Sequence, residues 1–344
     1  MNERVRVLVV DDSAFARKVL REVLGTDSRI EVIGVARDGL EALEKIATMK
    51  PDVITLDLGM PGLDGIGVLE ALRQRHHPPR AVLVTMSGPA TALGIEALAS
   101  GAFDIVRKPT SLATDRLYEL GGELVSKVLA AAAASPDVVR LPVARTSAVE
   151  APSIAKSTDI VVIGASTGGP RALAALLRAL PGHFPVPIAV VIHMPSGYTQ
   201  TFARRLDGDS NCQVSEARDG AALVAGSVTI ARAGVHMKVA RGDDTPYVVF
   251  DDQPTSSLHR PSVDELFVSA AKEFGPGVLG VVLTGMGDDG LAGARAIVEA
   301  KGRVLVEAAS SCVVHGMPRV ILEAGLATGE FPIDEMARAI VDHL

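Results

Sequence analysis

The sequence contains no tryptophan, and aromatic residues make up only 3% of it. Proteins that bind single-stranded nucleic acid use aromatic side chains as stacking platforms, so this scarcity argues against such a surface. The formal net charge of −7 points the same way, because nucleic-acid binding normally shows as a basic face. We therefore expect no nucleic-acid partner.

Cysteine is also scarce, with only Cys212 and Cys312, far apart in the chain. Two distant cysteines fit a reducing compartment and offer no pair of metal ligands. No stretch of about 18 apolar residues is free of charges and breakers, so no membrane insertion is expected. The first apolar run is too short and too soon acidic for a signal peptide. We therefore expect a cytoplasmic location.

What the sequence does have is a long alternation of strand-like and helix-like segments. The 344 residues are about twice the length of one domain, and 48% of them are hydrophobic. In the first 130 residues an amphipathic segment follows each of several apolar runs, at 5–10, 30–36, 51–58, 80–87 and 103–109. Such alternation is typical of a parallel sheet with helices on both faces.

The composition changes between residues 132 and 157, where Ala, Pro and Ser dominate and no apolar face repeats. We interpret this stretch as a linker whose first alanines extend the preceding helix. The predicted domains are therefore 1–131 and 158–344. The fold class is α/β, and the second domain is expected to be doubly wound and mostly parallel, with an antiparallel hairpin-like insert spanning 226–250.

Polar residues of the first domain follow several of its strands. Asp11 and Asp12 follow the first strand, Asp57 the third, Thr85 the fourth and Lys108 the fifth. Because the carboxyl ends of parallel strands meet at one edge, these side chains should converge there. Crowded carboxylates need a cation, and an oxygen-rich cluster suits Mg²⁺. The metal and Lys108 would then neutralise a phosphoryl group on Asp57, with Thr85 bonded to its oxygens. Each residue alone is equally explained as a turn or cap former.

In the second domain the segment "VVIGASTGGP" places Ser166 on a turn from a strand into a helix. Three interpretations remain open: a serine nucleophile near helix-start N–H groups, a phosphate or dinucleotide loop, and a structural turn with Ser166 as helix cap. The spacing of Gly164, Gly168 and Gly169 is not that of a dinucleotide loop, and no acidic residue lies about 20 positions on.

A serine nucleophile needs a base and a group that orients the base. His193 follows the next apolar strand, and Asp288 and Asp289 lie in a glycine-rich turn after another. A lone histidine is more often structural, and the two aspartates alone could form a turn or a metal site. The order Ser, His, Asp differs from that of α/β-hydrolases, and the G-x-S-x-G elbow is missing, so any hydrolase here is of another kind.

Two sets of motifs carry a resemblance to known families. The segments "VVDDS", "LDLGMPGLDG", "VTMS" and "VRKP" resemble the flavodoxin-like receiver domain of two-component response regulators. The segments "GASTGGP", "HMPSGYTQTFARRL", "HRPSVDELF", "LTGMGDDG" and "GMPR" resemble the chemotaxis protein-glutamate methylesterases. Together the two resemblances cover essentially the whole chain.

The resemblance implies a serine hydrolase that cleaves glutamate γ-methyl esters on methyl-accepting chemotaxis receptors and releases methanol. Many members also deamidate receptor glutamines. By motif, Ser166 is the nucleophile, His193 the base and Asp289 the carboxylate, while Thr167 and the backbone N–H of Met286 lie near the oxyanion. No cofactor is implied for the ester reaction. Mg²⁺ is implied at the receiver site, and the implied phosphodonor is a chemotaxis-type sensor histidine kinase.

The sequence departs from the two families at a few positions. Gly59 stands where a larger, often acidic residue is common, and Ile105 stands where an aromatic switch residue is usual. Arg232 and Ala233 replace Pro and Gly before His236.

Two rival functions remain. A DNA-binding output domain would need a recognition helix and a basic surface, which the acidic second half does not suggest. A catalytically silent adaptor would keep the fold but would not need Ser, His and Asp. The presence of all three in the sequence argues against it.

Overall fold

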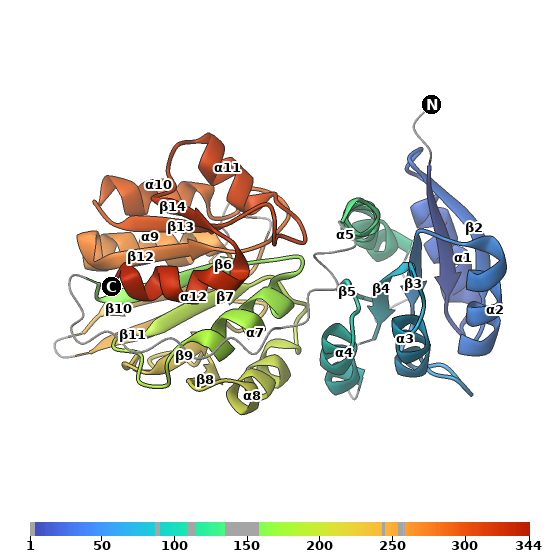
Figure 1. Cartoon of the computed structure of the whole chain (residues 1–344), viewed down its shortest axis with the longest axis horizontal. Coiled ribbons are helices and arrows are strands. Elements are labelled where there is room, and N and C mark those ends of the chain that lie inside the picture. The colour runs from blue at the N-terminus through green and yellow to red at the C-terminus, as the bar shows by residue number, and fades with distance from the viewer. Residues whose placement is uncertain are drawn as a thin grey trace. The chain divides into compact units, whose positions relative to one another are not determined.

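The computed structural model describes residues 4–86, 90–108, 114–134, 158–242, 245–253, 257 and 259–344. The chain divides into two compact units, residues 1–139 and 140–344 (Figure 1). Most of the predicted linker, residues 135–157, lies outside the described residues. The exact domain boundaries therefore stay a prediction.

The first unit is built on a five-stranded parallel sheet in the order β2-β1-β3-β4-β5. Its strands are β1 (Val5–Val10), β2 (Ile30–Ala36), β3 (Val53–Leu56), β4 (Arg80–Thr85) and β5 (Asp104–Arg107). This order confirms the predicted flavodoxin-like winding. The strand order reverses between β1 and β3, and ligands of such sheets bind at that point.

Helices alternate with these strands as the periodicity predicts (Figure 1). They are α1 (Ala14–Leu24), α2 (Gly39–Met49), α3 (Gly65–Arg73), α4 (Ala90–Ala99) and α5 (Thr114–Ala133). Ser13, Asp38 and Asp64 cap the first three, because each side chain accepts a hydrogen bond from a backbone N–H of the first turn. The alanine run does extend α5, as expected.

The second unit contains a seven-stranded parallel sheet in the order β14-β13-β12-β6-β7-β9-β8. Its strands are β6 (Ile160–Ala165), β7 (Ile188–Ile192), β8 (Gln213–Glu216), β9 (Ser227–Ile230), β12 (Val278–Val282), β13 (Arg303–Glu307) and β14 (Gly329–Phe331). The antiparallel insert is the hairpin of β10 (His236–Arg241) and β11 (Pro246–Asp251). The predicted mostly parallel fold with an antiparallel hairpin is therefore confirmed.

One part of that prediction is wrong. Residues 227–230 were expected in the hairpin-like insert, but β9 pairs in parallel with both β7 and β8. Its burial explains the error, because Val228, Thr229 and Ile230 are all buried, and a strand covered on both faces does not alternate. The short polar strands β8 and β14 were not anticipated.

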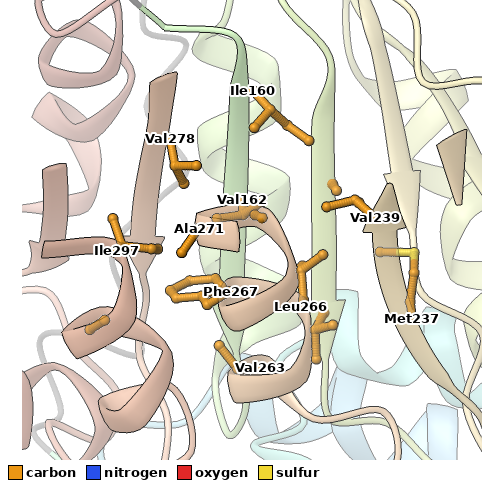
Figure 2. Packing of buried hydrophobic residues seen from close by; sticks show 14 of the residues in the cluster. Ile160, Val162, Met237, Val239, Val263, Leu266, Phe267, Ala271, Val278 and Ile297 are labelled. Carbon is orange, nitrogen blue, oxygen red and sulfur yellow. The ribbon is translucent and has the colours of Figure 1, made fainter. Parts of the chain in front are cut away.

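The helices of the second unit cover both faces of its sheet. They are α7 (Gly169–Ala179), α8 (Thr199–Asp209), α9 (Val263–Phe274), α10 (Leu291–Glu299), α11 (Met317–Glu323) and α12 (Ile333–Asp342). Helix α9 is central: its Val263, Leu266 and Phe267 belong to one hydrophobic cluster with Ile160 and Val162 of β6, and all five are fully buried (Figure 2). This packing anchors α9 across the middle of the sheet.

The sheet order also locates the expected ligand crevice of the second unit. The chain passes from β6 to β7 on one side, and later returns to place β12 on the other side of β6. The carboxyl ends of β6 and β12 therefore flank the point where the winding reverses. Among the helices that the structure describes, none has the length and apolar character needed to span a bilayer.

Candidate active site

Ser166 directly follows β6 at this point of reversal. Its backbone N–H donates to the carbonyl of Thr284 at 3.0 Å, and Gly169 N–H donates to the Ser166 carbonyl at 2.7 Å. Gly168 has a left-handed φ of +80°, and a Cβ there would lie 2.5 Å from Cβ of Val313. The glycine pair is therefore explained by backbone shape and close packing around the serine.

His193 directly follows β7, the neighbouring strand. Its backbone N–H donates to Ala165 O at 3.0 Å, which ties the loops after β6 and β7 together. Its Nε2 lies 2.8 Å from Oδ2 of Asp289. With an ionised Asp289, Nε2 carries the proton and Nδ1 has the free lone pair. Nδ1 is buried and has no hydrogen-bond partner in the described part of the chain.

Asp289 is held by four hydrogen-bond contacts. Besides His193, its donors are Ser262 Oγ at 2.8 Å, Val263 N–H at 2.8 Å and Asp264 N–H at 3.0 Å. Burial raises the pKa of Asp289, but the bond to His193 and the backbone N–H groups outweigh it and lower that pKa to about 2. The carboxylate is therefore ionised at neutral pH. The neighbouring Asp288 is exposed, so the geometry favours Asp289 as the partner of His193.

Thr167 follows Ser166 in the chain, and Met286 follows a residue that packs against Ser166. Thr167 is 2% exposed, and its Oγ1 is buried with no hydrogen bond among the described residues. Met286 follows Gly285, where a Cβ would lie 2.9 Å from Cβ of Ser166. Buried polar atoms are normally paired. The unpaired Thr167 Oγ1 and His193 Nδ1 are therefore both free to bond to a polar ligand.

The structure adds residues that the sequence did not assign to the site. The ring of His259 stacks on His193 with centroids 3.9 Å apart and planes at 17°. Ser262 and Asp264 contact Asp289, as described above. These residues lie in the segment "HRPSVDELF", to which the sequence analysis assigned no role in the site. Its serine, followed by acidic residues before an apolar helix, marks a helix start and could have indicated Ser262 and Asp264.

Glu307, at the end of β13, supports the loop beneath Ser166. It is fully buried and accepts from Thr284 N–H at 2.8 Å and Ser311 Oγ at 2.9 Å. Burial raises the pKa of Glu307 to about 7, although the bonds from Thr284 and Ser311 act against this. The folded protein therefore binds a proton here at a pH where the unfolded chain does not.

This proton gives a prediction for stability. Between about pH 4.5 and 7 the folded state binds more protons than the unfolded state, so Glu307 lowers the free energy of unfolding as the pH rises through this range. We expect a loss of about 2–3 kcal/mol from pH 5 to pH 8, measured by urea unfolding. Glu307→Gln should remove this loss, and the exposed Glu323→Gln should keep it. The same slope in Glu307→Gln as in the wild type would contradict the assignment.

In the first unit the predicted polar residues also meet at the carboxyl edge. Asp11, Asp12 and Asp57 each offer an oxygen, and these oxygens lie within 4.8 Å of one another. Lys108 Nζ lies 2.6 Å from Oδ2 of Asp57 and 2.6 Å from Oδ2 of Asp11. Thr85 ends β4, and its carbonyl accepts from Lys108 N–H at 2.9 Å. Three carboxylates therefore lie close together with Lys108, as the sequence predicts, and their negative charges favour a bound cation.

Burial and the neighbouring carboxylate disfavour the ionised form of Asp11, whereas a nearby positive charge favours it. Burial raises the pKa of Asp11, and the charge of Asp57 raises it further, while Lys108 lowers it. Carboxylate oxygens at this spacing match the ligands that Mg²⁺ prefers.

The structure shows the surroundings of three positions at which the sequence departs from the two families. A Cβ on Gly59 would meet no atom within 4 Å, so the position has room for the larger residue common in the family. Ile105 is 2% exposed and lies on β5, within the hydrophobic core of the first unit. Ala233 N–H donates to Thr199 Oγ1 at 3.3 Å, so the altered loop is tied to the start of α8.

The folds and sites define a two-unit α/β protein, in which one unit carries a receiver-like acidic cluster and the other a His193–Asp289 pair tied to the strand that precedes Ser166. A family profile described as "CheB methylesterase" matches residues 161–340, and one described as "Response regulator receiver domain" matches residues 7–119. The chain belongs to the CheB methylesterase family.

Individual relatives agree with this assignment. The chain is 54% identical to "Protein-glutamate methylesterase/protein-glutamine glutaminase 5" of Myxococcus xanthus, over 99% of this chain and 98% of that protein. It is 39% identical to "Protein-glutamate methylesterase/protein-glutamine glutaminase" of Bacillus subtilis, over 98% and 97%. The crystal structure of the Thermotoga maritima CheB methylesterase catalytic domain matches with a TM-score of 0.53 and 38% identity, covering 55% of this chain and all of that one.

Proposed function

We propose that this protein is a phosphorylation-controlled serine hydrolase that demethylates glutamate γ-methyl esters on chemoreceptors and also deamidates receptor glutamines. The relatives named above carry both activities in their names. The observation that carries the proposal is the Asp289–His193 pair, which leaves Nδ1 of His193 buried and unpaired next to the Ser166 loop.

In the proposed reaction His193 Nδ1 takes the proton of Ser166 Oγ, and Oγ attacks the ester carbonyl carbon. The resulting C–O⁻ is stabilised by donors beside Ser166, for which Thr167 Oγ1 and the N–H of Met286 are the candidates. The carbonyl re-forms, the C–OCH₃ bond breaks, and His193 returns its proton so that methanol leaves. Water, activated by the same nitrogen, then cleaves the acyl-enzyme and releases glutamate. Asp289 holds the tautomer throughout.

For the first unit we propose phosphorylation at Asp57. Asp11, Asp12 and Asp57 supply the oxygens that would hold Mg²⁺, which when bound neutralises the phosphoryl charge. Lys108 already contacts Asp57 and would pair with the phosphoryl group, and Thr85 would donate to its oxygens. The expected phosphodonor is a chemotaxis-type sensor histidine kinase. The two buried free cysteines suit the reducing cytoplasm, where this signalling takes place.

The test is methanol release from membranes that carry methylated chemoreceptors, measured with the full-length protein, with and without Mg²⁺ and a small-molecule phosphodonor. Release that depends on the protein supports the esterase. If the protein binds these membranes without releasing methanol, the silent adaptor is the better description. Binding to DNA in place of receptors would favour the transcriptional alternative.

The base in this mechanism gives a pH prediction. Because the pKa of Asp289 is about 2, that carboxylate stays ionised from pH 4 to 8 and cannot cause a loss of rate in this range. A histidine base must be neutral, so turnover should fall on acidification with one apparent proton. His193→Gln should lower turnover by about 10³-fold or more and abolish this acid limb.

Glu307 also titrates near this range, so Glu307→Gln is the matched control, and the acid limb should persist in it. A His193→Gln protein that keeps both its activity and the acid limb would show that His193 is not the base.

A further inference from the structure

Asp264, the second residue of α9, is a partly buried carboxylate next to the Asp289–His193 pair. The start of α9 donates to Asp289 through Val263 N–H at 2.8 Å and Asp264 N–H at 3.0 Å. Asp289 therefore caps the N-terminus of α9 from another part of the chain.

The reverse contact is also made. Asp264 Oδ1 accepts from Gly290 N–H at 2.9 Å and from Gly293 N–H at 2.7 Å. Gly290 is the N-cap residue of α10, which begins at Leu291, and Gly293 lies in the first turn of that helix. The N-terminus of α9 thus has the carboxylate of Asp289, from the loop before α10, and the N-terminus of α10 has the carboxylate of Asp264 from α9, in both cases where negative charge is favoured.

This reciprocal arrangement is costly in electrostatic terms. Burial, together with the charges of Asp289 and Asp288, raises the pKa of Asp264 to about 6, although the Gly293 and Gly290 N–H groups act to lower it. A buried carboxylate, Asp289, beside a partly buried one, Asp264, is a poor choice for stability alone. The close approach of α9 and α10 also requires Gly293, because a Cβ there would lie 2.4 Å from Cβ of Phe267 and 3.2 Å from Cα of Asp264.

We propose that Asp264 is a positioning residue for the hydrolysis, which acts by fixing the place of Asp289. The Gly290 N–H that Asp264 holds is adjacent to Asp289, so Asp264 keeps Asp289 Oδ2 at 2.8 Å from His193 Nε2. This inference rests on the proposed esterase function. A small displacement of a group that orients a catalytic base is expected to slow the reaction without weakening substrate binding.

The experiment compares Asp264→Ala, Asp264→Asn and Asp264→Glu in the full-length protein by methanol release from methylated receptor membranes. We expect Asp264→Ala to lower kcat by about 10- to 100-fold and to leave KM within about twofold. Asp264→Asn should keep kcat within about threefold of the wild type, because its amide oxygen still accepts both N–H bonds. Asp264→Glu, with the charge kept but the oxygens displaced, should be slower than Asp264→Asn.

Asp207→Ala is the control for a purely structural loss, because Asp207 accepts a 2.8 Å bond from Val214 N–H away from the site. Its kcat should remain near the wild-type value. A second control introduces Asp264→Ala into Asp289→Ala, where it should cause no further loss if Asp264 acts through Asp289.

Three results would overturn the inference while the wild type is active: equal losses in Asp264→Ala and Asp207→Ala, a full additional loss in the Asp289→Ala background, or a slower Asp264→Asn than Asp264→Glu. The last comparison stands even if Asp264→Ala does not fold. An inactive wild type would refute the proposed function itself, and this outcome is separate from the others.

Discussion

Replacing Ser166 with alanine is expected to reduce methanol release by about 10⁴-fold or more, with the protein still folded. The hydroxyl is the only group of this side chain that can attack the ester, and loss of the nucleophile in serine hydrolases of this kind removes nearly all the rate enhancement. The side chain is 9% exposed and adjoins the closely packed Gly285, so the smaller alanine fits the same space. Release is measured over hours with a large excess of enzyme.

The matched control is Ser227→Ala. Ser227 begins β9, which runs parallel to β7, so it lies at the opposite edge of the sheet from Ser166. This variant should keep the wild-type rate. Circular dichroism and thermal unfolding of both variants show whether the fold is retained. Near wild-type turnover in Ser166→Ala would exclude Ser166 as the nucleophile and leave it as a turn residue.

The sequence was sufficient to predict which loops carry the polar residues at one edge of each sheet, because parallel strands all end at that edge. Ser166, His193 and Asp289 each follow a strand, and the sheet order places those strands side by side as β12-β6-β7. The same rule brings Asp11 and Asp57 together after the adjacent strands β1 and β3.

Other features could not be predicted because they depend on contacts between distant segments. The family motif singles out Asp289 over Asp288, but the physical reason for that choice is the set of donors at the start of α9, which no spacing near the aspartates indicates. The stacking of His259 on His193 and the support of Thr284 by Glu307 likewise join different loops. The parallel pairing of β9 was missed because a short buried strand has no alternating pattern to give its direction.

The second large effect is expected at Asp57. In the present structure Lys108 pairs with both Asp57 and Asp11. Phosphorylation turns the singly charged Asp57 carboxylate into an acyl phosphate that carries a charge of about −2. This charge draws Lys108 and the metal toward it, which gives the first unit a second state. If the esterase is restrained in the first state, phosphorylation should raise its rate by about 5- to 150-fold, the usual range of coupling between sites.

Asp57→Asn should therefore keep the full-length enzyme at its low basal rate even with Mg²⁺ and a phosphodonor. Asp52→Asn is the matched control, because Asp52 lies one residue before β3 and its carboxylate accepts a 2.8 Å bond from the backbone N–H of Arg6, at the opposite end of the strand from Asp57. It should respond to the phosphodonor like the wild type. Full activation of Asp57→Asn would mean that Asp57 is not the phosphorylated residue.

Removal of residues 1 to about 150 tests how the restraint works. The second unit has its own sheet and core, so it should fold alone, and circular dichroism checks this. If the unphosphorylated first unit restrains the site by occlusion, the shortened protein should be faster than the intact unphosphorylated protein and indifferent to the phosphodonor. If it is no faster, simple occlusion is excluded. Activation must then come from a change at the Ser166 site or from recruitment of the receptor, and the two differ in whether kcat or KM responds to the phosphodonor.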